Sequence, residues 1–244
     1  MGEVYLAEDQ RLGRKVAVKV LNRTFSQQPD NLNRFFREAR AASALNHPNI
    51  LVVHEIGEHD GTHFIVSEYV PGPTLREKLS NGPLLLREVL DISIQAAEAL
   101  LAAHAGGLVH RDIKPENVIV RPDAIVKILD FGIAKTTGNS DKDGLNDNIT
   151  DDSSGIILGT LNYMSPEQAK AELLDARTDI FSLGVIIYEM ITGRNPFGGD
   201  SPLETIANLM NGEPRPLSEL AVGIPPELER IVDKTLSKKR EDRY

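Results

Sequence analysis

The residues from His110 to Asn117 place charged and polar side chains in a short segment between two apolar stretches. A carboxylate (Asp112), an ammonium (Lys114) and an amide (Asn117) fall within this segment, the last two at spacings of two and five residues from the first. Such a set can orient a hydroxyl group and hold a phosphate that is bound to a metal ion. Pro115 fixes its own φ and disfavours helix at Lys114, which predicts a stiff loop. A solvated surface turn accounts for the proline but not for this combination of side chains.

Two further motifs extend this chemistry. The apolar run over 125–129 ends in Asp130-Phe131-Gly132, and the alternating run over 15–21 carries Lys19 directly after Val-Ala-Val. Together with the segment from His110 to Asn117, these motifs resemble those of Hanks-type (eukaryotic-like) serine/threonine protein kinases, of a bacterial kind. The resemblance covers the chain from Gly2 to Arg243. It implies an α+β, bilobal protein kinase fold, with a small antiparallel β-sheet lobe that carries one helix and a larger, mainly α-helical lobe.

The resemblance also implies a role for each catalytic residue. Asp112 would accept the proton of the incoming hydroxyl, and Lys114 would steady the γ-phosphate of ATP. Asn117 and Asp130 would bind the metal ions at the phosphates, Mg²⁺ with Mn²⁺ as an alternative. A lysine two residues after the catalytic aspartate is typical of serine/threonine kinases, so the implied acceptors are Ser and Thr hydroxyls of protein substrates.

Lys19 would contact the α- and β-phosphates of ATP, as the same resemblance implies. The apolar pattern predicts an amphipathic helix over 31–45, with Glu38 on its buried side. An unpaired buried carboxylate is costly, so Glu38 needs a partner, and the kinase family implies Lys19 in that position. Solvated surface positions for Lys19 and Glu38 are the alternatives.

Residues 67–70 resemble the hinge that joins the two lobes of a kinase. Main-chain groups of Glu68 and Val70 would bind adenine there, and the small Ser67 would leave room for bulky substituents on the base. The other implied members of the ATP site are Gly2, Val4, Ala17 and Ile119. Gly2 would be the third glycine of the phosphate-covering loop, whose first two glycines are absent. We therefore expect the chain to be a fragment of a longer protein.

Regular elements must bring these residues together. The predicted ranges are strands over 15–21, 50–56 and 62–70, and helices over 87–105, 201–211 and 226–237, with Thr74 as a helix cap. One kinase catalytic domain would span 1–244. The resemblance divides it into a small lobe over 1–70 that lacks its first strand and a large lobe over 71–244 that lacks its last helix.

The stretch from Asp130 to Glu167 would be the activation segment. Its polar middle contains the best candidates for autophosphorylation by self-associated copies, namely Thr150, Ser153 and Ser154. Acidic residues between 139 and 147 are spaced as in a calcium-binding loop, but that loop would end in Thr150 instead of glutamate. A polar loop is the better interpretation.

Four further residues would support the site. Thr160 would contact the catalytic aspartate and lysine, and Glu167 would pair with Arg243. Asp179 would accept hydrogen bonds from backbone N–H groups of the catalytic loop, with an ordinary helix N-cap as the alternative. His104 is expected to be a packed or partly exposed side chain and not a metal ligand.

Composition narrows the classes of function. A chain of 244 residues with 41% hydrophobic content suits one large domain or two joined lobes. The formal charge of −9 argues against nucleic acid as a partner, and the absence of cysteine excludes disulfides. The longest apolar run, over 180–191, is too short for a membrane span. We expect a cytoplasmic location, although a longer parent protein could be anchored in a membrane.

Two rival functions remain open at this level. The first is a non-catalytic module with a kinase fold, which the missing glycines of the nucleotide loop would favour. The second is phosphorylation of a small molecule. Residues 159–167 disfavour the second rival, because the matching segment of the kinase family docks peptides.

Overall fold

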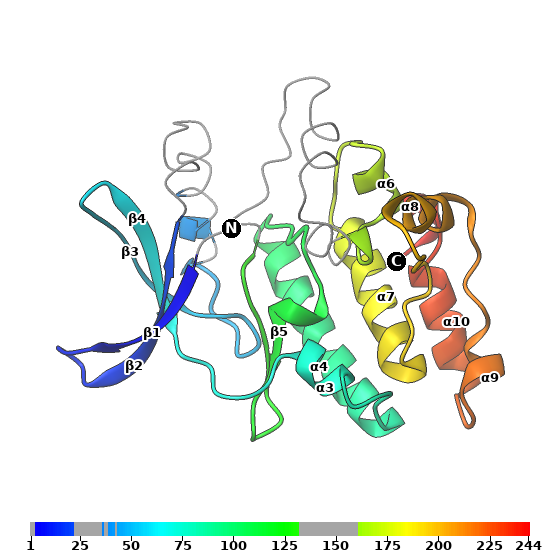
Figure 1. The fold of residues 1–244 in the computed structure, drawn as a ribbon, viewed down its shortest axis with the longest axis horizontal. Coiled ribbons are helices and arrows are strands. Elements are labelled where there is room, and N and C mark those ends of the chain that lie inside the picture. Colours follow the sequence, from blue (N-terminus) through cyan, green and yellow to red (C-terminus); the bar gives the residue numbers. More distant parts are fainter. Residues whose placement is uncertain (1–2, 22–35, 37–38, 42, 132–160) are drawn as a thin grey trace.

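The fold places a small antiparallel sheet beside a larger group of helices (Figure 1). The computed structural model describes residues 3–21, 36, 39–41, 43–131 and 161–244. Several residues with roles expected from the sequence lie outside this set: Gly2, Glu38, Thr150, Ser153, Ser154 and Thr160. Within the described ranges, none of the helices combines the length and the apolar character that a bilayer crossing requires.

The small sheet has the strand order β1-β2-β4-β3, and each strand is antiparallel to its neighbours. Its strands are β1 (Glu3–Asp9), β2 (Arg14–Val20), β3 (Val53–His59) and β4 (Thr62–Glu68). Asp60 and Gly61 have φ values of 48° and 70°, as the central pair of a tight hairpin turn requires. In β2, Ala17 lies opposite Ser67 of β4, and Lys19 lies opposite Ile65. Because Ala17 and Lys19 are two residues apart, their side chains share one face of the sheet.

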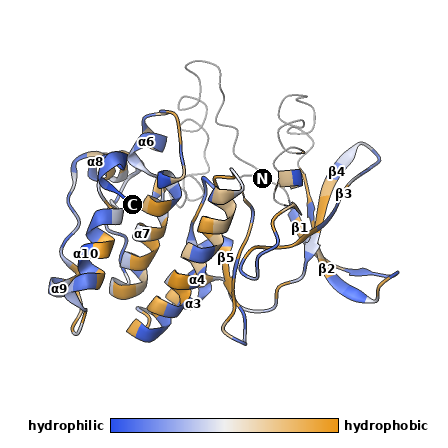
Figure 2. Ribbon diagram, turned by 180° about the vertical axis from the view of Figure 1, so that it is seen from behind, coloured by the Kyte–Doolittle hydropathy of each residue, from blue (hydrophilic) through white to orange (hydrophobic). Residues whose placement is uncertain are grey.

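The larger lobe is built around α7 (Arg177–Thr192), which is buried on nearly every side and packs against α4 (Leu86–Ala105) and α10 (Pro226–Thr235). Hydrophobic residues concentrate on α4 and α7, whereas the outer helices α8 and α9 are more polar (Figure 2). The helices are α3 (Leu75–Leu79), α4 (Leu86–Ala105), α6 (Pro166–Ala169), α7 (Arg177–Thr192), α8 (Pro202–Asn211), α9 (Leu217–Leu220) and α10 (Pro226–Thr235), with 3-10 turns η1 (Pro115–Asn117) and η2 (Arg240–Asp242).

A two-stranded ladder joins the segment that ends at Asn117 to the segment that leads to Asp130. In β5 (Val118–Val120) and β6 (Val126–Ile128), Val118 pairs with Ile128. This register makes Asn117 and Leu129 neighbours, and the N–H of Leu129 donates to the carbonyl of Asn117 at 2.9 Å. Asn117 and Asp130 therefore lie at the same end of the ladder.

The predicted elements are present, with shifts at their ends. The strand expected over 50–56 begins at Val53, because Ile50 forms a bridge with Ile128 instead. Residues 36, 39–41 and 43 are helical, within the range where the sequence predicts the helix of the small lobe. Thr74 caps α3 as expected: the N–H of Glu77 donates to its hydroxyl, and the Glu77 carboxylate accepts from the N–H of Thr74.

Candidate active site

Asp179 holds in place the backbone of residues 110–117, the catalytic loop expected from the sequence. Its Oδ1 accepts a hydrogen bond from the N–H of Arg111, and its Oδ2 accepts one from the N–H of His110, each at 2.8 Å. Asp179 is fully buried, and a buried carboxylate is costly unless hydrogen-bond donors such as these stabilise it. The expected contact between Asp179 and the catalytic loop is confirmed.

His104, at the end of α4, adds a third donor to the same carboxylate. Its Nε2 lies 2.8 Å from Oδ2 of Asp179, and beside a carboxylate this nitrogen must carry the proton. The side chain is 16% exposed, in agreement with the packed position expected from the sequence. No sequence pattern points to its partner, which lies 75 residues further along the chain.

Asp112, Lys114 and Asn117 meet at one carboxylate oxygen. Lys114 Nζ lies 3.0 Å from Oδ2 of Asp112, and Asn117 Nδ2 donates to the same oxygen at 3.3 Å and to the Asp112 carbonyl at 2.8 Å. The turn η1 makes this possible, because it brings Asn117 back over Asp112 five residues later. Arg111, which precedes Asp112, has φ of 66°, an uncommon backbone conformation that often occurs at functional sites.

Asp130 lies beside Lys19 of the small lobe. Lys19 Nζ and Asp130 Oδ2 are 2.6 Å apart, and their side chains are 16% and 34% exposed. Asp130 has φ of 55°, a second left-handed backbone at this site. The catalytic segment and the residues around Asp130 are also joined by His110, whose Nε2 lies 2.7 Å from the Leu129 carbonyl and whose ring packs against Phe131. The expected partner of Lys19, Glu38, is not among the described residues.

The predicted hinge is fixed by an ion pair that sequence reasoning missed. Lys127 Nζ lies 2.6 Å from Glu68 Oε1 and donates to the Ile50 carbonyl at 3.1 Å. The same Glu68 oxygen accepts from the N–H of Val52 at 2.9 Å. Lys127 is 6% exposed although it is charged, and a lysine inside the apolar run over 125–129 was the only signal of this pair.

The remaining residues of the implied nucleotide site lie on β1, on β2, just after β4 and on β5. Val4 lies on β1 opposite Lys19, and Ala17 lies on β2 opposite the buried Ser67. Val70 is buried just after β4, and Ile119 of β5 forms an isolated bridge with Thr74. Val4 and Ala17 thus belong to the sheet of the small lobe, whereas Ile119 belongs to the β5–β6 ladder.

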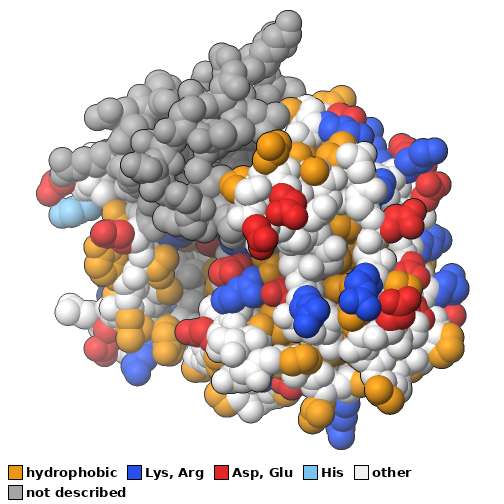
Figure 3. Space-filling view, turned by 45° about the vertical axis from the view of Figure 1, so that its right-hand side comes forward, with side chains coloured by type: hydrophobic (Ala, Val, Ile, Leu, Met, Phe, Trp, Pro, Cys, Tyr) orange, Lys and Arg blue, Asp and Glu red, His pale blue; other side chains and the backbone are white. Residues whose placement is uncertain are grey.

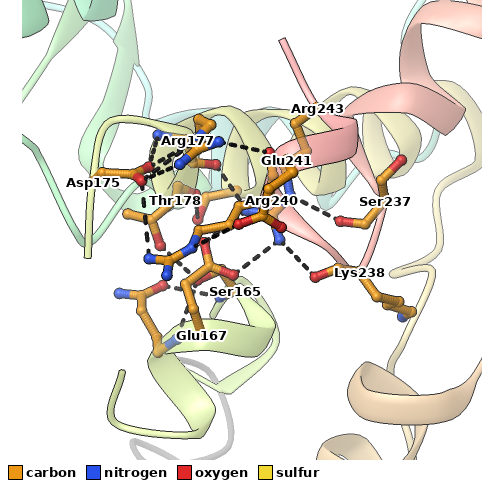
Figure 4. A network of polar contacts seen from close by, with 12 residues as sticks. Ser165, Glu167, Asp175, Arg177, Thr178, Ser237, Lys238, Arg240, Glu241 and Arg243 are labelled. Atoms are coloured by element: carbon orange, nitrogen blue, oxygen red, sulfur yellow. Dashed lines mark hydrogen bonds and ion pairs between the residues drawn. The ribbon is translucent and has the colours of Figure 1, made fainter. Parts of the chain in front are cut away.

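The end of the expected activation segment is anchored to the C-terminal residues. Arg243 donates to both oxygens of Glu167, at 2.7 and 2.9 Å, and also to the carbonyl of Arg177 (Figure 4). Burial would raise the pKa of Glu167, but the hydrogen bonds and charge of Arg243, together with hydrogen bonds from Ser165 and from the backbone, lower that pKa below its usual value. The expected Glu167–Arg243 pair is confirmed.

Gln168 connects this anchored region to the catalytic loop. Its Nε2 donates to the carbonyl of Arg111 at 2.8 Å, and its backbone N–H is capped by the hydroxyl of Ser165. Ser165 lies 2.5 Å from the hydroxyl of Thr178 at the start of α7. The segment around α6 is therefore positioned directly against the loop that carries Asp112.

Comparisons with known proteins agree with this geometry. The protein kinase domain model matches residues 1–244. The serine/threonine-protein kinase PknB of Mycolicibacterium smegmatis is 42% identical over the whole chain, and the match covers 39% of that protein. The corresponding values are 44% and 36% for the probable serine/threonine-protein kinase SCO3848 of Streptomyces coelicolor, and 38% and 36% for PrkC of Bacillus subtilis. The chain thus spans less than two fifths of the length of these relatives.

Solved structures support the same assignment. The PknI kinase domain of Mycobacterium tuberculosis matches with a TM-score of 0.75 and 29% identity, over 100% of this chain and 86% of that one. The chain belongs to the protein kinase family and is similar along its whole length to bacterial serine/threonine-protein kinases of the Hanks type.

Proposed function

We propose that this chain transfers the γ-phosphoryl group of Mg·ATP to Ser or Thr hydroxyls of proteins. The observation that carries the proposal is the meeting of Lys114 and Asn117 at Oδ2 of Asp112. A carboxylate fixed in this way can orient a substrate hydroxyl and accept its proton. Lys114, a cation 3.0 Å from that oxygen, would stabilise the negative charge of the phosphoryl group during transfer.

The metal-binding role is assigned to Asn117 and Asp130. The amide nitrogen of Asn117 faces Asp112, so its Oδ1 is the atom that could bind a cation. Mg²⁺ in proteins is usually held by one or two side-chain oxygens together with substrate phosphates, and the side-chain oxygens of Asn117 and Asp130 fit this pattern of coordination. Mn²⁺ would accept the same oxygens. A divalent ion bound with ATP neutralises charge on the phosphates.

Lys19 would bind phosphates that approach Asp130, because the two side chains are only 2.6 Å apart. Glu68 and Val70 would bind adenine through the main chain, and the remaining members of the proposed nucleotide site are Gly2, Val4, Ala17, Glu38 and Ile119. We further propose one catalytic domain over 1–244, with lobes over 1–70 and 71–244. Autophosphorylation at Thr150, Ser153 or Ser154 in self-associated copies and a cytoplasmic location belong to the same proposal.

Phosphate transfer from radiolabelled ATP, with Mg²⁺ present or removed, tests this function. The wild-type chain should label itself or a general protein substrate, and Asp130→Asn and Asp112→Asn should abolish labelling. Asp123→Asn is the matched control, because Asp123 is an exposed carboxylate in the turn between β5 and β6. Folding of each variant is checked by circular dichroism.

The alternative outcomes separate the rival functions. A folded wild-type chain that shifts its melting temperature with ATP but transfers no phosphate would be a binding module. Label that appears only on small molecules would contradict a protein substrate. Labelling that survives in both aspartate variants would overturn the proposed roles of Asp112 and Asp130.

A further inference from the structure

Arg76 forms ion pairs with two carboxylates, those of Glu116 and Glu189. Its Nε donates to Glu116 Oε1 at 2.7 Å, and its Nη1 donates to Glu189 Oε1 at 2.8 Å. Its Nη2 donates to the hydroxyl of Tyr163, which in turn donates to Glu189 Oε2. One guanidinium therefore joins α3 to the catalytic loop, to α7 and to the segment before α6.

These contacts leave little capacity for a second cation. Both oxygens of Glu189 are engaged, one by Arg76 and one by Tyr163. Burial raises the pKa of Tyr163 and the Glu189 carboxylate raises it further, so the hydroxyl remains protonated and can donate. Burial opposes the charge of Arg76, but the bonds to Glu116 and Glu189 outweigh it and raise its pKa. Arg76 is thus a permanent cation.

The cluster lies where a protein substrate could reach it. The side chains of Arg76 and Glu116 are 38% and 42% exposed, whereas Glu189 is only 11% exposed. Glu116 directly precedes Asn117, and Tyr163 lies in the segment that resembles a peptide-docking region. On the visible face, acidic and basic side chains are interspersed instead of forming a field of one sign (Figure 3).

We infer that Arg76 determines substrate specificity, by occupying the Glu116–Glu189 pair and so excluding a basic substrate side chain from it. The inference rests on the proposed function, because it concerns the peptide that would present its hydroxyl to Asp112. In the wild type, the preferred peptide has a neutral or acidic residue at the position that reaches this cluster. Without Arg76, two carboxylates would face the docking region with no guanidinium between them, and an arginine of the peptide would take its place.

Peptide binding, measured by fluorescence anisotropy without turnover, tests the inference. Each labelled peptide contains one Ser and one Arg, and the position of the Arg differs by one residue from one peptide to the next. For each position, a peptide with Ala in place of the Arg is the reference. In Arg76→Met, one Arg position should bind about tenfold more tightly than its Ala reference, a change of about 1.4 kcal/mol. The wild type should show no such gain. Arg230→Met is the matched control, since Arg230 forms an exposed pair with Glu227 on α10.

A further variant distinguishes this role from a merely structural one. Adding Glu116→Gln and Glu189→Gln to Arg76→Met should remove the gain, because the carboxylates that bind the peptide arginine are then absent. If Arg76→Met does not fold, Arg76→Gln retains a donor to Glu189 and allows the same comparison. No gain at any position in a folded variant, or a gain that persists without the carboxylates, would overturn the inference. A wild type that binds peptides but transfers no phosphate would contradict the proposed function alone.

Discussion

Lys127 Nζ lies 2.6 Å from Glu68 Oε1, so one ion pair joins the strand that leads to Asp130 with the predicted adenine-binding hinge. The side chains are 7% and 22% exposed, which shields the pair from salt and water. Lys127 also donates to the Ile50 carbonyl, so it connects three segments of the chain.

Lys127→Met should therefore destabilise the fold, because it leaves the Glu68 carboxylate without its cation. We expect a loss of about 2 kcal/mol in the free energy of unfolding, measured by urea denaturation. Adding Glu68→Gln should recover part of the loss, since the unpaired charge is removed while the acceptor for the N–H of Val52 remains. Equal stability of Lys127→Met and the wild type would show that the pair contributes nothing.

His104 should support catalysis through Asp179. His104→Phe removes one of the three donors to the Asp179 carboxylate and leaves the two backbone donors of the catalytic loop. We expect kcat to fall on the order of tenfold with little change in KM for ATP, because a loosened loop misplaces Asp112 and not the nucleotide. His59→Phe, at the exposed end of β3, is the control. A KM effect without a kcat effect would contradict this role.

Ser67 should make the adenine pocket tolerant of large bases. It is buried, and its cross-strand partners are Ala17 on β2 and Val53 on β3, so neither Ser67 nor the facing Ala17 carries a bulky side chain at this point of the sheet. ATP analogues with a bulky N6 substituent should compete with ATP for the wild type, and Ser67→Met should weaken these analogues far more than ATP. If the bulky analogues bind the wild type and Ser67→Met equally well, the adenine base does not lie beside Ser67.

The predictable part of the structure is local, and the unpredictable part is long-range. The turn at Asp60-Gly61 and the cap at Thr74 follow from residues adjacent in sequence. The meeting of Asp112 with Asn117 follows from a short loop with a proline. The resemblance to kinases also predicted two long-range contacts, the Glu167–Arg243 pair and the contact of Asp179 with the loop that carries Asp112.

Some contacts cannot be predicted from the pattern of the sequence. Lys127 is one charged residue in an apolar run, and its partner Glu68 lies 59 residues away. Arg76 is the second residue of the short helix α3, and nothing in the sequence distinguishes it from a surface arginine, yet its acceptors come from three other segments of the chain. Side chains of this kind acquire partners only when packing brings their elements together, so periodicity and spacing alone do not reveal them.

The Glu167–Arg243 pair should make stability depend on pH. The folded-state pKa of Glu167 lies below its usual value of 4.5, so the unfolded chain binds the proton more readily. The stabilisation is fully present well above 4.5 and is lost as the pH falls through the lowered pKa of the folded state. Glu167→Gln should be less stable by about 3 kcal/mol at pH 7, because Arg243 is then buried without a carboxylate, and the difference should shrink in acid.

Unfolding by urea at a series of pH values measures this difference. Glu227→Gln, which removes an exposed carboxylate paired with Arg230, should change stability little at any pH. A difference between Glu167→Gln and the wild type that stays constant down to acid pH would assign the effect to packing and not to charge.

Gly184 lets α7 and α10 approach closely. A Cβ at this position would lie 2.1 Å from Oγ1 and 2.8 Å from Cβ of Thr235, distances at which the helices must move apart. Gly184→Ala gains about 1 kcal/mol of helix propensity, but overpacking in a close-packed interior costs about 1–3 kcal/mol, so a net loss of stability is expected.

Urea denaturation measures this loss of stability, and adding Thr235→Ala to the Gly184→Ala chain should reduce the loss by removing Oγ1. Gly198→Ala, whose Cβ would meet nothing closer than 3.4 Å, is the control. A Gly184→Ala chain as stable as the control would mean that α10 can shift without cost, which the buried contacts of α7 with α10 argue against.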